Sequence, residues 1–392
     1  MDAARPVVIV GGGPAGLAVA RGYRAAGGRA AVTLLAAEAH SPYRRPPLTK
    51  DFLRGRIGAD ELPIEADAWF REHGIDLRRG APVAALRTGS REVELATGER
   101  LPYGECVLCT GSEPVRPPVP GADDPRVHAI RTIEDSAALA TAVRAGVRVV
   151  VIGSGFIGCE AAASLAMRGA DVTVVTPEDA PQSERLGDEV GARLRAWLEE
   201  AGVEVATGVT VTGIGEEGAA MAVALDTGRQ VPCDRVVLGT GVRPRIELAE
   251  AAGVRVEEGA VPTDERMRSS ADGVRCAGDI ALADNPTAGR RLRVEHWGEA
   301  LAQGEVAGRS IAGEEARWDA VPGFWSTIGL RTIKQAAWGD GWDEVRVDSD
   351  AGGFTAWYGR EGRLVGVLTH ERDRDYDRGS RLVAEGAPWP PA

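Results

Sequence analysis

The sequence predicts an α/β fold in which one strand–turn–helix–strand unit occurs twice, followed by a small α+β domain. Two apolar, β-branched runs, residues 6–10 and 147–152, each lead directly into a glycine-rich turn and a helical stretch. Such runs are typical of buried parallel strands. Residues 344–347, 354–358 and 363–368 instead form short strand-like segments separated by glycine turns, which is typical of an antiparallel meander.

The first glycine-rich turn has the spacing G-x-G-x-x-G at Gly11, Gly13 and Gly16. The first glycine allows a tight turn, the second lets the backbone approach a pyrophosphate, and the third lets helix and strand pack closely. The N-terminus of the following helix, predicted over residues 17–26, offers N–H groups and partial positive charge to phosphates. A turn without a ligand is the alternative, but the helix and the next strand, residues 31–35, favour a dinucleotide site.

The same unit occurs a second time. Gly153, Gly155 and Gly158 have the same spacing, and a helix over 159–167 and a strand over 171–175 are predicted after them. One turn can hold a flavin dinucleotide and the other a nicotinamide dinucleotide, so that a hydride can pass between the two.

Three further strand ends carry candidate site residues. Residues 107–111 and 236–241 are apolar strands that end in Thr-Gly, and each is expected to carry the chain between domains. A short strand at 274–279 ends in Gly-Asp, and a helical stretch is expected after it. Asp279 would there accept a hydrogen bond from a ribityl hydroxyl, with a plain helix N-cap as the alternative.

Composition restricts the class of protein. The 392 residues suggest two or three domains, and a net charge of -12 argues against a general nucleic-acid binder. No apolar run reaches the roughly 18 residues of a membrane helix, and the polar start of the chain predicts no signal peptide. Five cysteines suit a reducing compartment and lack metal or iron–sulfur spacing. We therefore expect a cytoplasmic protein without a bound metal.

Several segments spread over almost the whole chain carry a family resemblance. These are 42–50 (PYRRPPLTK), 155–160 (GFIGCE), 240–244 (TGVRP), 276–279 (CAGD), 294–297 (VEHW) with Gln303-Gly304, and 324–326 (FWS). With them the chain resembles the FAD-dependent pyridine nucleotide reductases, and within these the ferredoxin reductases that serve bacterial oxygenases.

The resemblance implies two Rossmann-like dinucleotide-binding domains in a glutathione-reductase-like arrangement. The FAD-binding domain would be discontinuous, 1–115 and 241–318, and the NAD(P)H-binding domain would span 116–240. The C-terminal α+β domain would span 319–392 and close with a helix over 374–385.

The resemblance also implies site residues. Lys50 would lie near the reactive edge of the flavin and pair with Glu160, and a buried lysine does need such a carboxylate. A surface lysine is the alternative for Lys50, and core packing is the alternative for Trp297. The expected FAD residues are Gly11, Gly13, Pro14, Ala15, Gly16, Glu38, Arg45, Pro46, Lys50, Thr110, Gly111, Asp279, Glu295, His296 and Trp297. The expected NAD(P)H residues are Gly153, Gly155, Phe156, Ile157, Gly158, Glu160, Glu178, Thr240 and Gly241.

The sequence departs from the usual pattern where acidic residues should end the second strand of each unit. Ala36 and Thr176 occupy these positions, and Glu38 and Glu178 lie two residues further on. We expect the two glutamates to reach the ribose hydroxyls. No arginine cluster follows the second strand, which favours NADH over NADPH, although Arg185 leaves NADPH open.

The positions of the cysteines argue against disulfide chemistry. Disulfide reductases of this fold place a cysteine pair where this chain has residues 41–50, which contain no cysteine. Cys106 and Cys109 form a C-x-x-C pattern, but strand alternation would point their side chains to opposite faces. Cys159, Cys233 and Cys276 are expected to be small buried hydrophobes.

The predicted function is an FAD-dependent NAD(P)H:ferredoxin reductase. NADH would give hydride to flavin N5, and single electrons would pass to a [2Fe–2S] ferredoxin serving an oxygenase or cytochrome P450. Arg290, Arg291, Arg293, Arg331 and Lys334 are candidates for a basic docking patch, with a solvated charged turn as the alternative. A soluble NADH:quinone or NADH:oxygen oxidoreductase, or a non-enzymatic flavin redox sensor, remain alternative functions.

Overall fold

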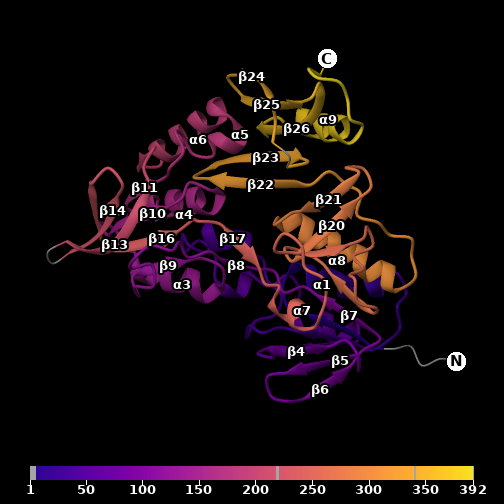
Figure 1. Cartoon of the computed structure of the whole chain (residues 1–392). Helices are drawn as coiled ribbons and strands as arrows, with labels where there is room; N and C mark the ends of the chain where they lie inside the picture. The colour runs from indigo at the N-terminus through magenta and orange to yellow at the C-terminus, as the bar shows by residue number, and fades with distance from the viewer. Residues whose placement is uncertain (1–5, 218–219, 340, 392) are drawn as a thin grey trace. The chain divides into compact units, whose positions relative to one another are not determined.

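The computed structural model describes residues 6–217, 220–339 and 341–391, and the chain divides into two compact units (Figure 1). Unit 1 consists of Met1–Arg44, Leu62–Glu113 and Arg243–Phe324. Unit 2 consists of Arg45–Glu61, Pro114–Val242 and Trp325–Ala392. The segment with Arg45 and Lys50 thus belongs to unit 2, although the resemblance implies a place in the FAD-binding domain. The predicted boundaries of the three domains stay a prediction.

Unit 1 is built on a parallel five-stranded sheet in the order β19–β7–β1–β2–β3. Its central strand has no polar residue and is buried along its length, because neighbours cover both its edges and both its faces. The strands are β1 (Val7–Val10), β2 (Val32–Leu35), β3 (Ile75–Arg78), β7 (Glu105–Leu108) and β19 (Val274–Cys276).

Helix α1 (Pro14–Ala25) connects β1 to β2 and packs against α8 (Trp297–Ile311). The two backbones come close because glycines face the contact. A Cβ atom on Gly304 would lie 2.3 Å from the carbonyl oxygen of Ala15, and one on Gly308 would lie 2.2 Å from that of Val19. Larger residues at these positions would force the helices apart.

Two small sheets complete unit 1. One consists of β4 (Val83–Arg87), β5 (Glu92–Leu95) and β6 (Arg100–Pro102), and the other of β18 (Val261–Thr263), β20 (Ala281–Asn285) and β21 (Arg290–Arg293). Short helices α2 (Asp67–Glu72) and α7 (Glu247–Ala251) also lie in this unit.

The prediction of a helical stretch after Asp279 is wrong, because strand β20 follows Asp279. The alanine-rich run favours a helix by propensity, but β20 pairs with β18 on one edge and β21 on the other. Pairing and burial in the sheet outweigh that propensity. The alternative of Asp279 as a helix N-cap is therefore excluded too.

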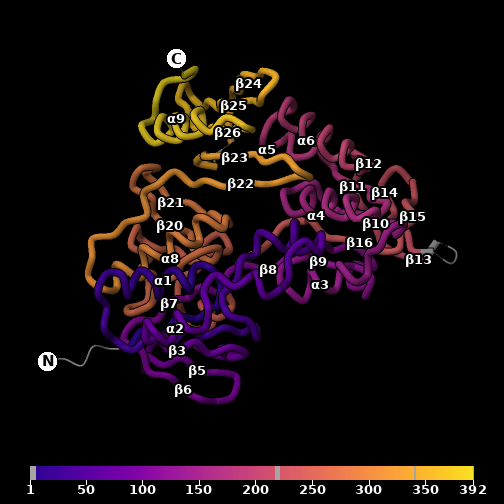
Figure 2. Tube along the Cα trace, turned by 180° about the vertical axis from the view of Figure 1, so that it is seen from behind, coloured from indigo at the N-terminus to yellow at the C-terminus, as the bar shows by residue number. Residues whose placement is uncertain are grey.

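Unit 2 contains a second parallel five-stranded sheet, in the order β12–β11–β10–β16–β9. Its strands are β9 (Val127–Ala129), β10 (Arg148–Ile152), β11 (Asp171–Val175), β12 (Val203–Ala206) and β16 (Arg235–Leu238). Helices α4 (Phe156–Ala166) and α6 (Asp188–Glu200) pack against it (Figure 2). Helices α3 (Ile133–Ala142) and α5 (Ser183–Leu186), and an antiparallel sheet of β13 (Val211–Glu217), β14 (Ala220–Leu225) and β15 (Gln230–Cys233), complete this part.

The C-terminal part is a five-stranded sheet in the order β22–β23–β26–β25–β24, with α9 (Asp373–Ala384) packed on it. The predicted meander corresponds to β24 (Glu344–Asp350), β25 (Gly353–Arg360) and β26 (Arg363–His370). Strands β22 (Gly323–Ile328) and β23 (Arg331–Ala337) were not predicted. No helix in the described part of the chain is long and apolar enough to cross a membrane.

Candidate active site

The first glycine-rich turn has the geometry of a pyrophosphate cradle. A Cβ on Gly16 would lie 2.0 Å from the carbonyl oxygen of Gly11, and Gly11 itself has a φ of +123°, so both positions require glycine. Gly13, in contrast, has open space within 4 Å of its Cβ position, and it precedes the first turn of α1. Pro14 and Ala15 supply no acidic side chain there. The free N–H groups of α1 are therefore open to an anion, as a dinucleotide requires.

The second turn repeats this geometry in unit 2. A Cβ on Gly158 would lie 2.2 Å from the carbonyl oxygen of Gly153, whereas one on Gly155 would make only an ordinary contact, at 3.6 Å. Helix α4 starts at Phe156 without an acidic residue in its first turn. Ile157 is 43% exposed in that turn. A second dinucleotide fits here for the same reasons as the first.

The strand ends beside the two turns differ. In unit 1, Ala36 is buried against Gly12. A Cβ on Gly12 would lie only 2.4 Å from the Ala36 Cβ. At the matching positions of unit 2, the hydroxyls of Ser154 and Thr176 are hydrogen-bonded at 2.8 Å.

The two glutamates beyond these strand ends already have protein partners. Glu38 accepts a hydrogen bond from the Tyr43 hydroxyl at 2.6 Å. Glu178 accepts one from the backbone N–H of Glu184 at 3.1 Å and a longer one from Ser154 at 3.4 Å. Their predicted contacts with ribose hydroxyls stay predictions.

The two Thr-Gly segments lead into the paired strands β8 (Ser112–Pro114) and β17 (Val242–Pro244), in which the chain passes between the units. Their hydrogen bonds match. The Thr110 hydroxyl donates to the Arg245 carbonyl at 2.7 Å, and the Thr240 hydroxyl donates to the Val115 carbonyl at 2.6 Å. Gly111 and Gly241 follow with φ of +67° and +92°.

Asp279 lies beside the first turn. Its carboxylate accepts a hydrogen bond from the buried Ser112 hydroxyl at 2.6 Å, and Gly278 would place a Cβ 3.1 Å from that of Ala15. The Gln303 side chain holds this loop by accepting the Gly278 N–H at 2.9 Å. The aspartate is therefore fixed near α1, and its role toward the flavin ribityl chain stays a prediction.

The segment before α8 is partly buried. Glu295, His296 and Trp297 are each of intermediate exposure, and Trp297 opens the helix. The His296 ring lies 4.7 Å from the Phe324 ring, centroid to centroid. Trp297 is thus not one of the fully buried core side chains, so core packing does not account for it completely.

A buried polar cluster forms around Glu160 within unit 2. The ammonium group of Lys50 and the hydroxyl of Thr49 each lie 2.5 Å from Oε2 of Glu160. The hydroxyl of Ser326 and the N–H of Thr327 donate to Oε1, at 2.8 and 3.2 Å. The Lys50 side chain is 13% exposed and that of Glu160 is 5% exposed, so Lys50 is not a surface lysine. Thr49, Ser326 and Thr327 were not predicted as site residues, although Thr49 and Ser326 lie in segments that carry the family resemblance.

The segment that carries Lys50 is tightly anchored. The Ser164 hydroxyl on α4 donates to the Thr49 carbonyl at 2.6 Å, and Arg45 donates to the Arg131 carbonyl at 2.6 Å. The Ser136 hydroxyl donates at 2.7 Å to the carbonyl of Leu48, which lies within the 3₁₀ turn Pro46–Thr49. These bonds fix the backbone from which Lys50 extends.

All five cysteines are free and buried. Burial raises the pKa of the Cys106, Cys109, Cys159 and Cys276 thiols well above their usual range, and it raises the pKa of Cys233 to about 11. Thiol–disulfide exchange requires an accessible thiolate. None of these cysteines can supply it, which agrees with the prediction against disulfide chemistry.

Carboxylates lie beside the cations of the predicted docking patch. The ion pairs are Arg291 with Glu257 and Asp284, Arg293 with Glu295, Arg331 with Glu200, and Lys334 with Asp373. An acidic partner would therefore meet less positive charge at these residues than the sequence indicated. The docking patch stays a prediction.

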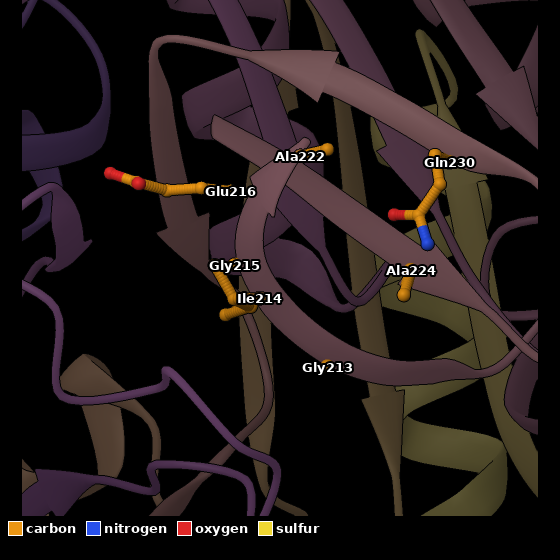
Figure 3. A pocket seen from close by; sticks show the side chains of 7 residues that line it. All are labelled: Gly213, Ile214, Gly215, Glu216, Ala222, Ala224 and Gln230. Atoms are coloured by element: carbon orange, nitrogen blue, oxygen red, sulfur yellow. The ribbon is translucent and has the colours of Figure 1, made fainter. Parts of the chain in front are cut away.

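A shallow pocket of about 270 Å³ lies on the β13–β15 sheet (Figure 3). It is lined by Gly213, Ile214, Gly215, Glu216, Ala222, Ala224 and Gln230. Figure 3 shows the Glu216 side chain extending away from the other lining side chains. The pocket is lined mostly by glycine and alanine, and it contains none of the predicted site residues.

Known proteins resemble this chain in sequence over almost its whole length. Rhodocoxin reductase of Rhodococcus erythropolis is 32% identical over 389 residues, which cover 98% of this chain and 91% of that protein. The ferredoxin–NAD(+) reductase component of the anthranilate 1,2-dioxygenase system of Burkholderia cepacia is 35% identical and covers 98% of this chain and 95% of its own.

Solved structures also match the chain over nearly its whole length. The structure of the covalent putidaredoxin reductase–putidaredoxin complex matches with a TM-score of 0.93 and 29% identity, covering 99% of this chain and 94% of that one. A water-forming NADH oxidase from Lactobacillus brevis matches with a TM-score of 0.88 at 19% identity, which shows a shared fold alone. The predicted α/β fold class is confirmed.

The family model described as pyridine nucleotide-disulphide oxidoreductase matches residues 5–304, which include both glycine-rich turns and Asp279. The chain belongs to the pyridine nucleotide-disulphide oxidoreductase family.

Proposed function

We propose that the chain carries electrons from NADH to a [2Fe–2S] ferredoxin that serves an oxygenase or a cytochrome P450. The predictions of an NAD(P)H-dependent oxidoreductase with FAD are confirmed at the level of the family. The ferredoxin is supported by relatives of matching length that are named as ferredoxin reductase components of oxygenase systems, from Burkholderia cepacia and, at 31% identity, Pseudomonas putida.

The observation that carries the proposal is the buried Lys50–Glu160 pair in a chain whose cysteines are all buried and free. FAD, when bound, can accept two electrons from NADH as a hydride and release them one at a time. The chain supplies no thiolate through which those electrons could reach a disulfide. This set of residues fits an acceptor that takes electrons directly from the flavin, and a one-electron carrier is such an acceptor.

The protein's own residues bind, orient and hold charge. We assign the Gly11–Gly16 turn and Asp279 to FAD, and the Gly153–Gly158 turn and Glu178 to NADH. In each turn the first helical N–H groups are free to bind phosphate oxygens. Lys50 holds a positive charge in a buried place, and Glu160 keeps that charge stable there.

We propose NADH rather than NADPH as the electron donor. If Glu178 lies beside the ribose hydroxyls as predicted, its carboxylate would repel a 2′-phosphate group. Arg185 is held by the Phe156 ring, with its guanidinium carbon 5.2 Å from the ring centroid. We also propose a cytoplasmic location, since five free cysteines suit a reducing compartment.

The test is a comparison of electron acceptors. Purified FAD-loaded protein would oxidise NADH with ferricyanide, with quinones, and with a [2Fe–2S] ferredoxin plus cytochrome c, and NADPH would be compared in parallel. The proposal predicts fast turnover through the ferredoxin. Fast reduction of quinone or oxygen without any ferredoxin effect would instead support a small-molecule oxidoreductase, and slow turnover with every acceptor would support a redox sensor.

A further inference from the structure

The Glu160 carboxylate has its hydrogen-bonding capacity fully used. Oε2 accepts hydrogen bonds from the Lys50 ammonium group and the Thr49 hydroxyl, and Oε1 accepts them from the Ser326 hydroxyl and the Thr327 N–H. An ionised carboxylate offers about four acceptor sites, and four donors occupy them. Because Glu160 is only 4% exposed, water does not compete for these positions.

The donors come from two different parts of the chain, and each part serves one oxygen. Lys50 and Thr49 belong to the anchored segment after Arg45, whereas Ser326 and Thr327 belong to strand β22. Rotation of the carboxylate would break bonds on both sides at once. The two donors of strand β22 therefore hold one side of the carboxylate, opposite the side that contacts Lys50.

Ser326 is the donor on β22 whose contribution depends on its side chain. It is 1% exposed, whereas Trp325 beside it is 45% exposed, as the alternation of a strand requires. Thr327 contributes its backbone N–H, and its hydroxyl is hydrogen-bonded to Thr332 at 2.9 Å.

We propose that Ser326 is a positioning residue, whose hydroxyl orients Glu160 so that the carboxylate fixes the Lys50 ammonium group. The C-terminal sheet, which contributes no residue to either glycine-rich turn, thereby takes part in the electron-accepting site. The effect on catalysis rests on the proposed function, whereas the effect on Lys50 itself does not.

The chain offers a direct measurement, because Lys50 and Lys334 are its two lysines. FAD-loaded protein would be treated briefly with acetic anhydride, and mass spectrometry would give the ratio of acetylation at Lys50 to that at Lys334. The Lys334 side chain is 43% exposed, so it serves as an internal standard. Ser326→Ala should raise the ratio about tenfold or more, as expected for the loss of one hydrogen bond to a charged group.

Two further variants separate positioning from general loosening. Ser326→Thr keeps a hydroxyl and should keep the ratio within about twofold of the wild type. Thr355→Val is the matched control, because Thr355 is a fully buried hydroxyl of the same sheet that donates to Asp375 at 2.7 Å. An unchanged ratio in Ser326→Ala, or an equal rise in Thr355→Val, would overturn the proposal.

If Ser326→Ala does not fold, Ser326→Cys replaces the hydroxyl with a much weaker donor at the same position and carries the same expectation. A kinetic measurement adds the catalytic consequence. In Ser326→Ala the rate of flavin bleaching at saturating NADH should fall about fivefold, while the Kd of NADH stays within about twofold. A wild-type protein that bleaches with NADH but does not reduce ferredoxin would refute the proposed function, and the acetylation ratio would still decide the role of Ser326.

Discussion

The two glycine-rich turns have the same backbone but different neighbours. In unit 1 the turn packs against Ala36, and α1 lies against the glycines of α8. In unit 2 the turn is held by the Ser154–Thr176 hydrogen bond, and α4 carries Glu160 into a polar cluster. The glycine spacing thus gives both turns the same backbone, while the side chains behind each helix differ in chemistry.

A second contrast concerns one buried glutamate in each unit. Glu160 contacts a lysine and three neutral donors. Glu299 on α8 has only neutral donors, the Trp318 ring N–H at 2.9 Å and the Gly323 N–H at 3.1 Å. Burial accordingly raises the pKa of Glu299. A carboxylate without a cation is suited to a structural role, whereas Glu160 can hold a charge in place.

The largest expected effect comes from the middle glycine of each turn. A Cβ on Gly13 meets nothing within 4 Å and one on Gly155 meets only a carbonyl at 3.6 Å, so both alanine variants should fold. Gly13→Ala should weaken FAD binding about a hundredfold, because the methyl group would occupy the place that we assign to the pyrophosphate. Gly155→Ala should keep FAD and weaken NADH binding by a similar factor.

Flavin absorbance of the purified proteins and titration with NADH would measure both affinities. Each variant serves as the control for the other. Loss of FAD in Gly155→Ala, with FAD retained in Gly13→Ala, would reverse the assignment of the two turns.

Replacing the buried cation should have the next largest effect. Lys50→Met leaves Glu160 with its three neutral donors and removes the positive charge. We expect NADH-driven flavin bleaching to slow roughly tenfold to fiftyfold, while Lys50→Arg retains more of the rate. Stopped-flow absorbance would measure this. Equal losses in the methionine and arginine variants would show that shape rather than charge matters at this position.

The Ser154–Thr176 pair predicts a moderate loss confined to unit 2. Thr176→Val keeps the volume of the side chain and leaves the buried Ser154 hydroxyl without its 2.8 Å partner. The free energy of unfolding should fall by about 1 kcal/mol, as measured by urea denaturation. Ala36→Ser, which adds a hydroxyl at the matching place of unit 1, should not stabilise the protein, because no partner hydroxyl stands opposite it at Gly12.

Glu299 predicts the smallest effect and a definite pH dependence. Its raised pKa means that the folded protein binds this proton more tightly than the unfolded chain does. Its contribution to stability is therefore fully present below the ordinary carboxyl pKa of 4.5 and is lost as the pH rises through the raised value. Relative to wild type, Glu299→Gln should gain stability as the pH rises from about 4 towards neutrality.

Urea denaturation at several pH values would check this, with the exposed Glu305→Gln on the same helix as the control. A difference between Glu299→Gln and wild type that does not change with pH would contradict the expectation.

Much of the fold could be predicted from sequence because its strongest signals are local. The first strand, the Gly11–Gly16 turn and α1 follow one another in the sequence, so they can be predicted without knowledge of their neighbours in the fold. The stretch after Asp279 failed because its alanines favour a helix, whereas partners from other parts of the chain make it a strand. Strand β22 was missed for a similar reason, since its edge position becomes apparent only in the sheet.

The site could be predicted only in part. The resemblance pointed to Lys50 and Glu160, which the structure brings together. The hydroxyls of Thr49 and Ser326 come from positions 111 and 166 residues away from Glu160, and nothing local to either residue indicates a carboxylate partner. Such long-range polar contacts depend on the packed structure.

The most direct test of the account is a double-mixing experiment without oxygen. FAD-loaded protein would first be mixed with NADH until the flavin absorbance is bleached, and then with an oxidised [2Fe–2S] ferredoxin or with a quinone. The account predicts that ferredoxin restores the flavin absorbance faster than the quinone does, in two one-electron steps. Rapid recovery with quinone and none with ferredoxin would contradict it.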